Sequence, residues 1–193
     1  ECGFGSCHGC IGIGFVTMIA ILWLCARARP HVVNVYFRKL QLISSGIMAL
    51  SHGSNDAQKT MGIITLALFS YGALPTFEVP AWVIVGCAIT MGLGTMAGGW
   101  RIIRTMGNKM IKLKPVHGFA AETSAATVIL TASHFGIPVS TTHIISTAIM
   151  GVGSTQGHHA LNLNIIKNIL IAWVLTIPVC MLIAAVLSFI LPF

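Results

Sequence analysis

Long apolar runs separated by short basic clusters constrain the fold of this chain more than any other feature. The run at 81–100 has no charged residue, and further apolar runs cover 11–26, 40–70, 118–150 and 165–191. Only 8% of the 193 residues are charged, whereas soluble domains carry about 25%. Lipid must therefore be the main solvent, which predicts an all-α, polytopic membrane protein.

The basic clusters indicate how the chain crosses the membrane. Lys and Arg gather at 27–39 and 101–114, which we expect on the cytoplasmic side, whereas the linker 71–80 has neither and should face outward. We therefore attribute the net charge of +7 to the Lys and Arg residues that orient the chain in the membrane, and we expect no nucleic-acid partner. The run 40–70 should cross once, as an interrupted helix. Because the first residue is Glu1, we expect a fragment or processed piece, with 1–10 as an N-terminal tail.

The run 118–150 is broken at the sequence Gly136-Ile137-Pro138. As one straight helix, its 33 residues would be about 50 Å long, too long for a hydrocarbon core of about 30 Å. Each half alone is too short to cross the core. We therefore predict a re-entrant hairpin with its tip at 136–140 and both ends on the cytoplasmic side, followed by a last helix that exits outward.

A first polar island interrupts the second apolar run at 51–60. His52 and Asp56 are four residues apart, on one face of a helix, and Lys59 follows Asp56 by three residues and could neutralise it. Asn55 offers both a hydrogen-bond donor and an acceptor. Ionisable residues inside a membrane are functional by default, so we favour a binding site over a self-paired polar cluster that only orders the bundle.

Two further polar islands lie in the predicted hairpin. Glu122 has no Lys or Arg near it in the following sequence, so it could carry a proton or bind a cation, or it could lie at the membrane boundary. The hydroxyls of Ser140, Thr141 and Thr142 follow Pro138 and could begin a new helix. A helix N-terminus binds oxyanions, and hydroxyls can also bind Na⁺; simple helix capping is equally compatible.

Taken together and in this order, three segments resemble the Pit-type inorganic phosphate transporters: Gly53-Ser-Asn-Asp-Ala-Gln-Lys-Thr-Met-Gly62, Glu122-Thr-Ser-Ala-Ala126 and Pro138-Val-Ser-Thr-Thr-His143. The Gln58-Lys59 pair is similar to bacterial members. The resemblance implies the second half of an inverted-repeat transporter in a cell (inner) membrane, which carries phosphate with H⁺ or Na⁺ and needs an N-terminal half or an oligomeric partner. It implies that the phosphate and cation site is lined by Asn55, Asp56, Ser140, Thr141 and Thr142, with His52 and Glu122 nearby.

Two other functions are compatible with parts of the sequence. Cys2, Cys7, His8 and Cys10 could hold a metal or redox centre on a membrane anchor, although a second ligand pair is missing. A channel is the other possibility. For a transporter we expect no catalytic residues, no metal site and no cofactor beyond the coupling cation, with phosphate and the lipid bilayer as partners.

Overall fold

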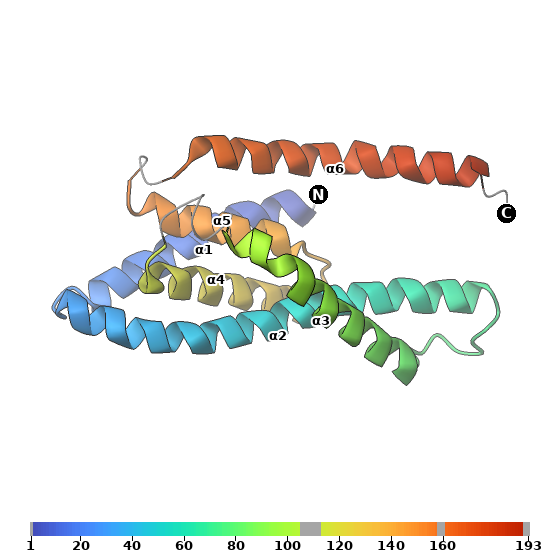
Figure 1. The fold of residues 1–193 in the computed structure, drawn as a ribbon, viewed down its shortest axis with the longest axis horizontal. Coiled ribbons are helices and arrows are strands. Elements are labelled where there is room, and N and C mark those ends of the chain that lie inside the picture. Colours follow the sequence, from blue (N-terminus) through green and yellow to red (C-terminus); the bar gives the residue numbers. More distant parts are fainter. Residues whose placement is uncertain (1, 105–112, 158–160, 191–193) are drawn as a thin grey trace.

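The computed structural model of this chain describes the backbone of residues 2–104, 113–157 and 161–190, and the side chains of these residues except 2–8, 101–103 and 190. The described part is helical throughout, with no strand (Figure 1). The helices are α1 (Cys2–Leu24), α2 (Pro30–Ser70), α3 (Ala81–Arg104), α4 (Pro115–His134), α5 (Thr141–Ser154) and α6 (Leu163–Ile190). The all-α prediction is therefore confirmed for these residues.

Helix α2 is continuous, and the interruption expected within 40–70 is wrong. It begins with Pro30 at its first turn and runs unbroken for 41 residues, or roughly 60 Å at the usual rise per residue. Its hydroxyl side chains bond back to the helix carbonyls, as Ser51 does to Ile47 O at 2.8 Å and Thr65 to Met61 O at 2.8 Å. The polar residues of 51–60 are thus part of one continuous helix, whose backbone hydrogen bonds they do not interrupt.

The N-terminal segment also differs from expectation. The segment 1–10 is not a separate tail, because α1 begins at Cys2 and continues through the first apolar run to Leu24. The apolar segments at 81–100 and 165–191 become α3 and α6 with small changes at their ends. Among the described residues, Ala81–Trp100 and Leu163–Phe189 are the helical stretches long and apolar enough to cross a membrane, and Gly9–Leu24 is a shorter apolar helix.

The core lies where α1, α4 and α5 meet the first half of α2 (Figure 1). Small residues allow this close packing: a Cβ added at Gly151 of α5 would collide with the backbone carbonyl of Ile11 in α1. Ala125, Ile129 and Ala148 are completely buried in the first core cluster. The core therefore rests on close helix approach, as is common between membrane helices.

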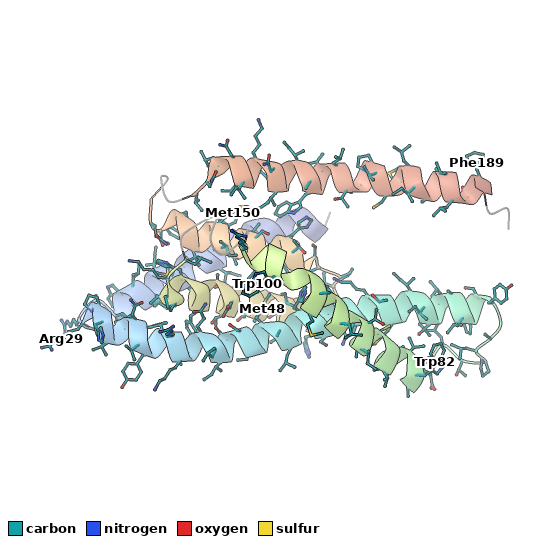
Figure 2. All side chains as sticks on the ribbon, viewed as in Figure 1. Arg29, Met48, Trp82, Trp100, Met150 and Phe189 are labelled. Carbon is teal, nitrogen blue, oxygen red and sulfur yellow. The ribbon has the colours of Figure 1, made fainter. Side chains whose placement is uncertain are left out.

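Helix α3 and most of α6 lie outside this core. Side chains project from the whole length of α6 in Figure 2, and Phe189 near its end is 88% exposed. In its first half, α6 packs against the second core cluster through Ile165, Ile166 and Ile169. The ring centroid of Trp173 lies 4.0 Å from that of His143 in α5. These two helices thus present apolar surface that the described residues do not cover.

Candidate functional site

The turn between α4 and α5 falls where the sequence predicted a helix break. Gly136 adopts φ 67°, a left-handed conformation that glycine adopts without the steric cost of a side chain. The backbone N–H of Ile137 donates to Ala132 O at 2.9 Å and that of Gly136 donates to Ser133 O at 3.1 Å, which closes the end of α4. After Pro138, Ser140 caps α5 by accepting a hydrogen bond from the His143 N–H at 3.4 Å.

This turn packs against α2 at Asn55 and Asp56, which brings the first and third polar islands together. The Thr141 hydroxyl donates to Asp56 Oδ2 at 3.0 Å, across 85 residues of sequence. Thr141 is 3% exposed, so this contact is enclosed by protein. Ser140 and Thr142 flank Thr141 in the first turn of α5, and their side chains are exposed.

Asn55 holds the turn in place through both ends of its amide. Its Nδ2 donates to the Val139 carbonyl at 3.2 Å and to Asp56 Oδ1 at 3.2 Å, and its Oδ1 accepts from the Ser133 hydroxyl at 3.3 Å. Asn55 is only 5% exposed. A buried amide in this position connects α2 to the last turn of α4 and to the loop before α5.

Lys59 and His52 lie beside the Asp56 carboxylate. Lys59 Nζ lies 3.2 Å from Asp56 Oδ1 and also donates to the Val139 carbonyl. His52 Nδ1 lies 3.6 Å from the other carboxylate oxygen, Oδ2. The N-terminus of α5, which carries a partial positive charge, adds to this environment through Thr141. We define the Asp56 cluster as His52, Asn55, Asp56, Lys59 and Thr141.

Glu122 lies at a second position on the α2–α4 interface. It accepts hydrogen bonds from the Ser44 hydroxyl and from the Ser45 hydroxyl, the latter at 3.0 and 3.1 Å. Ser44 and Asn55 are 11 residues apart on α2, which corresponds to roughly 16 Å along the helix axis. The structure therefore separates Glu122 from the Asp56 cluster.

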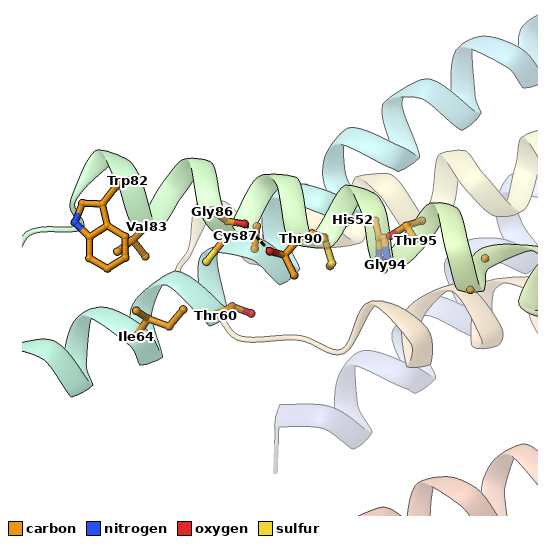
Figure 3. Close-up of a pocket in the computed structure, with 14 residues that line it drawn as sticks. His52, Thr60, Ile64, Trp82, Val83, Gly86, Cys87, Thr90, Gly94 and Thr95 are labelled. Carbon is orange, nitrogen blue, oxygen red and sulfur yellow. Dashed lines mark hydrogen bonds between the residues drawn. The ribbon is translucent and has the colours of Figure 1, made fainter.

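An open cleft lies beside the Asp56 cluster, between α2 and α3 (Figure 3). Its volume is about 590 Å³, and its α3 wall consists largely of small residues, including Gly86, Gly94 and Thr95. His52 reaches this cleft from α2 while its Nδ1 stays 3.6 Å from Asp56. The cleft therefore borders the cluster through the imidazole of His52.

Of the residues singled out in the sequence, the structure brings Asn55, Asp56, His52 and Thr141 into contact. Sequence reasoning left Lys59 out of the site, although its spacing from Asp56 was a clear signal. It also missed Ser133 and the Val139 carbonyl, which only the folded hairpin brings to Asn55. The serine partners of Glu122 were signalled only by two adjacent hydroxyls, Ser44-Ser45, within an apolar run.

The alternative of an N-terminal metal or redox centre receives no support. In the part of the chain whose side chains are described, no group of three or more His, Cys, Asp or Glu side chains could hold a metal ion. The side chains of Cys2, Cys7 and His8 lie outside that part.

Comparisons with known proteins agree on one family. Residues 8–184 match the Phosphate transporter family. A probable low-affinity inorganic phosphate transporter of Rhizobium meliloti is 48% identical over 92% of this chain and 55% of its own length. A protein of the same name from Bacillus subtilis is 39% identical over 93% of this chain and 54% of its own length. The chain thus spans about half the length of these relatives.

A solved structure gives the same result for the fold. "The sodium-dependent phosphate transporter" is similar to this chain with a TM-score of 0.68 and 32% sequence identity. The similarity covers 83% of this chain and 41% of the solved one.

Proposed function

Because this chain belongs to the phosphate transporter family, and is thus a membrane protein, we propose that it forms one half of a secondary transporter for inorganic phosphate. Transport is coupled to H⁺ or Na⁺ in a multi-pass protein of the cell membrane. The missing half, or an oligomeric partner, completes the site. The observation that carries the proposal is the docking of the α4–α5 turn on Asn55 and Asp56, because secondary transporters build their sites at broken helices.

We assign phosphate to the N-terminus of α5. Ser140 and Thr142 are exposed there, beside the buried Thr141, and free N–H groups at a helix start bind oxyanions. In this arrangement the hydroxyls and the helix dipole replace part of the water that phosphate loses. The pair α4 and α5 forms a re-entrant hairpin, so that phosphate meets this helix start within the membrane.

The Asp56 carboxylate needs a positive charge beside it when phosphate binds. Phosphate and Asp56 are both negative, and two negative charges about 4 Å apart repel by roughly 4 kcal/mol at an effective dielectric constant of 20. A positive charge beside Asp56 removes this repulsion and lets phosphate bind. Asn55 holds Asp56 and the turn in register, and His52 lies at the edge of the site that faces the cleft.

Glu122 is assigned a separate part in this proposal. Within the described part of the chain, its carboxylate accepts hydrogen bonds from two hydroxyls of α2, and we interpret it as a second ion-binding position along the same helix interface. It does not contact phosphate in the arrangement proposed above.

The test is uptake of radiolabelled phosphate by liposomes that contain the full-length transporter. We expect saturable uptake that depends on an imposed cation gradient, and we expect Asp56→Asn to abolish it. Glu78→Gln, an equally conservative change at an exposed carboxylate in the 71–80 linker, is the matched control and should leave uptake unchanged. Uptake by Asp56→Asn at the rate of the control would overturn the proposal.

A further inference from the structure

The ammonium group of Lys59 lies between two oxygen atoms from different parts of the chain. Lys59 Nζ lies 3.2 Å from Asp56 Oδ1, one turn earlier on α2, and donates to the carbonyl of Val139 in the α4–α5 turn. The Lys59 side chain is 36% exposed and that of Asp56 is 26% exposed. The ammonium thus lies at the junction of the helix and the turn, with one side open.

These two oxygens are of the kind that bind a coupling cation. Val139 precedes the N-cap Ser140, so no hydrogen bond within α5 uses its carbonyl; that oxygen receives the Asn55 amide and the Lys59 ammonium. In transporters, carbonyls freed at a helix break hold Na⁺ or H⁺. The Asp56 carboxylate and the Val139 carbonyl could therefore bind a monovalent cation, and the Lys59 ammonium already occupies that position.

The remaining positions around Asp56 are also taken. Oδ1 accepts from Asn55 as well as Lys59, and Oδ2 accepts from Thr141 and faces His52 at 3.6 Å. A second monovalent cation at Oδ1 would be repelled by the ammonium and would have to displace it. Neutralisation of Asp56 by Na⁺ from solution and neutralisation by Lys59 therefore exclude each other.

We propose that Lys59 is a tethered counter-ion that replaces Na⁺ at Asp56. This inference rests on the proposed transport function and specifies its cation at this carboxylate: Asp56 needs no sodium ion as long as Lys59 keeps its charge and its place. Removal of the ammonium opens the position, and Asp56 with the Val139 carbonyl then takes up Na⁺.

The test compares Na⁺ with choline at equal ionic strength. The purified full-length transporter is heated in detergent in sodium chloride or in choline chloride, and the difference between the two unfolding temperatures is the Na⁺ effect. The variants are Lys59→Met, which keeps an unbranched side chain of nearly the same length without the charge, and Lys59→Gln as a second neutral variant. Lys59→Arg keeps the charge, and Lys39→Met removes an exposed lysine elsewhere on α2.

We expect the Na⁺ effect to grow by several degrees in Lys59→Met and Lys59→Gln, and to match the wild type in Lys59→Arg and Lys39→Met. An unchanged Na⁺ effect in both neutral variants would overturn the proposal. Failure of both neutral variants to fold even in sodium chloride would also overturn it, because Na⁺ would then not replace the ammonium.

Phosphate uptake separates this inference from the proposed function. Liposomes with wild-type protein that take up no phosphate would refute the proposed function, while the unfolding temperatures would still decide the role of Lys59. If the wild type transports, we expect the initial rates of the two neutral variants to depend on Na⁺ at least fivefold more strongly than that of the wild type. Equal Na⁺ dependence would count against the tethered counter-ion.

Discussion

Asp56 and Glu122 are two carboxylates at the same interface between α2 and the α4–α5 hairpin, and their surroundings differ in kind. Asp56 has Lys59 at 3.2 Å, His52 at 3.6 Å and the start of α5 against it. Glu122 receives hydroxyls from Ser44 and Ser45, and among the described residues it forms no ion pair. Of the two carboxylates, Asp56 is the one that has both an ion-pair partner and a helix start beside it, and for this reason we place the substrate there.

After the loss of the Asp56 charge itself, the largest effect is expected from a change that opens the Asp56 cluster without touching a charge. Asn55→Leu leaves the Ser133 hydroxyl without its acceptor, at about 1–3 kcal/mol, and takes from the Val139 carbonyl one of its two donors, at about 0.5–1.5 kcal/mol. We expect the initial rate of phosphate uptake, normalised to the amount of protein in the membrane, to fall roughly 100-fold. Gln58→Leu removes an exposed amide from the same helix and should change the rate less than twofold. Equal rates for the two variants would show that the turn is not held through Asn55.

A smaller effect is expected at the hydroxyl that joins α5 to Asp56. Thr141→Val keeps the shape of the side chain and removes a hydrogen bond to a carboxylate, which contributes about 1.5–3 kcal/mol. The uptake rate should fall at least about tenfold. Thr141→Ser retains the hydroxyl and should keep most of the rate, so that a similar loss in both variants would point to packing instead of the hydrogen bond.

Neutralisation of the other carboxylate should matter less. In Glu122→Gln the amide oxygen can still accept a serine hydroxyl, so the contact between α4 and α2 is partly preserved. We expect this variant to retain more than about a tenth of the wild-type uptake rate, since only about 0.5–1.5 kcal/mol of hydrogen bonding is lost. Complete loss of uptake would mean that an ion at Glu122 is as necessary for transport as the Asp56 charge, and would remove the distinction between the two carboxylates.

The smallest effect concerns the turn itself. Gly136→Ala places a side chain on a residue with φ 67°, which costs about 1–2 kcal/mol. The unfolding temperature of the purified protein should fall by about 2–4 °C per kcal/mol. Gly46→Ala, at an exposed helical position with open space for a Cβ, should leave the temperature equal or raise it slightly. An equal fall in the unfolding temperature of both variants would mean that the left-handed conformation of Gly136 contributes nothing to the difference in stability.

The break between α4 and α5 and the residues that line it could be predicted from the sequence, because Gly136 and Pro138 act locally on the backbone. The pairing of Asn55 and Asp56 with Thr141 followed from the resemblance of three ordered segments to one family. That prediction depended on the order of the three segments along the chain, because no local sequence rule connects residues 85 positions apart.

The errors have a common physical origin. The polar residues of 51–60 suggested a broken helix, but side chains can be polar while the backbone stays fully bonded, and α2 is continuous. Glu122 was expected near Asp56, yet its distance from the cluster depends on how far α4 slides along α2. Sequence periodicity gives the face of each helix but not this relative position.

Phosphate binding at the start of α5 is tested most directly by protection from labelling. In the full-length transporter with its native cysteines replaced, Ser140→Cys and Ser45→Cys place single exposed thiols beside Asp56 and Glu122 respectively. The rate of reaction with a water-soluble maleimide is measured with phosphate and with sulfate at equal ionic strength. We predict that phosphate slows labelling at position 140 severalfold and leaves position 45 unchanged. Protection at position 45 with none at position 140 would contradict the account.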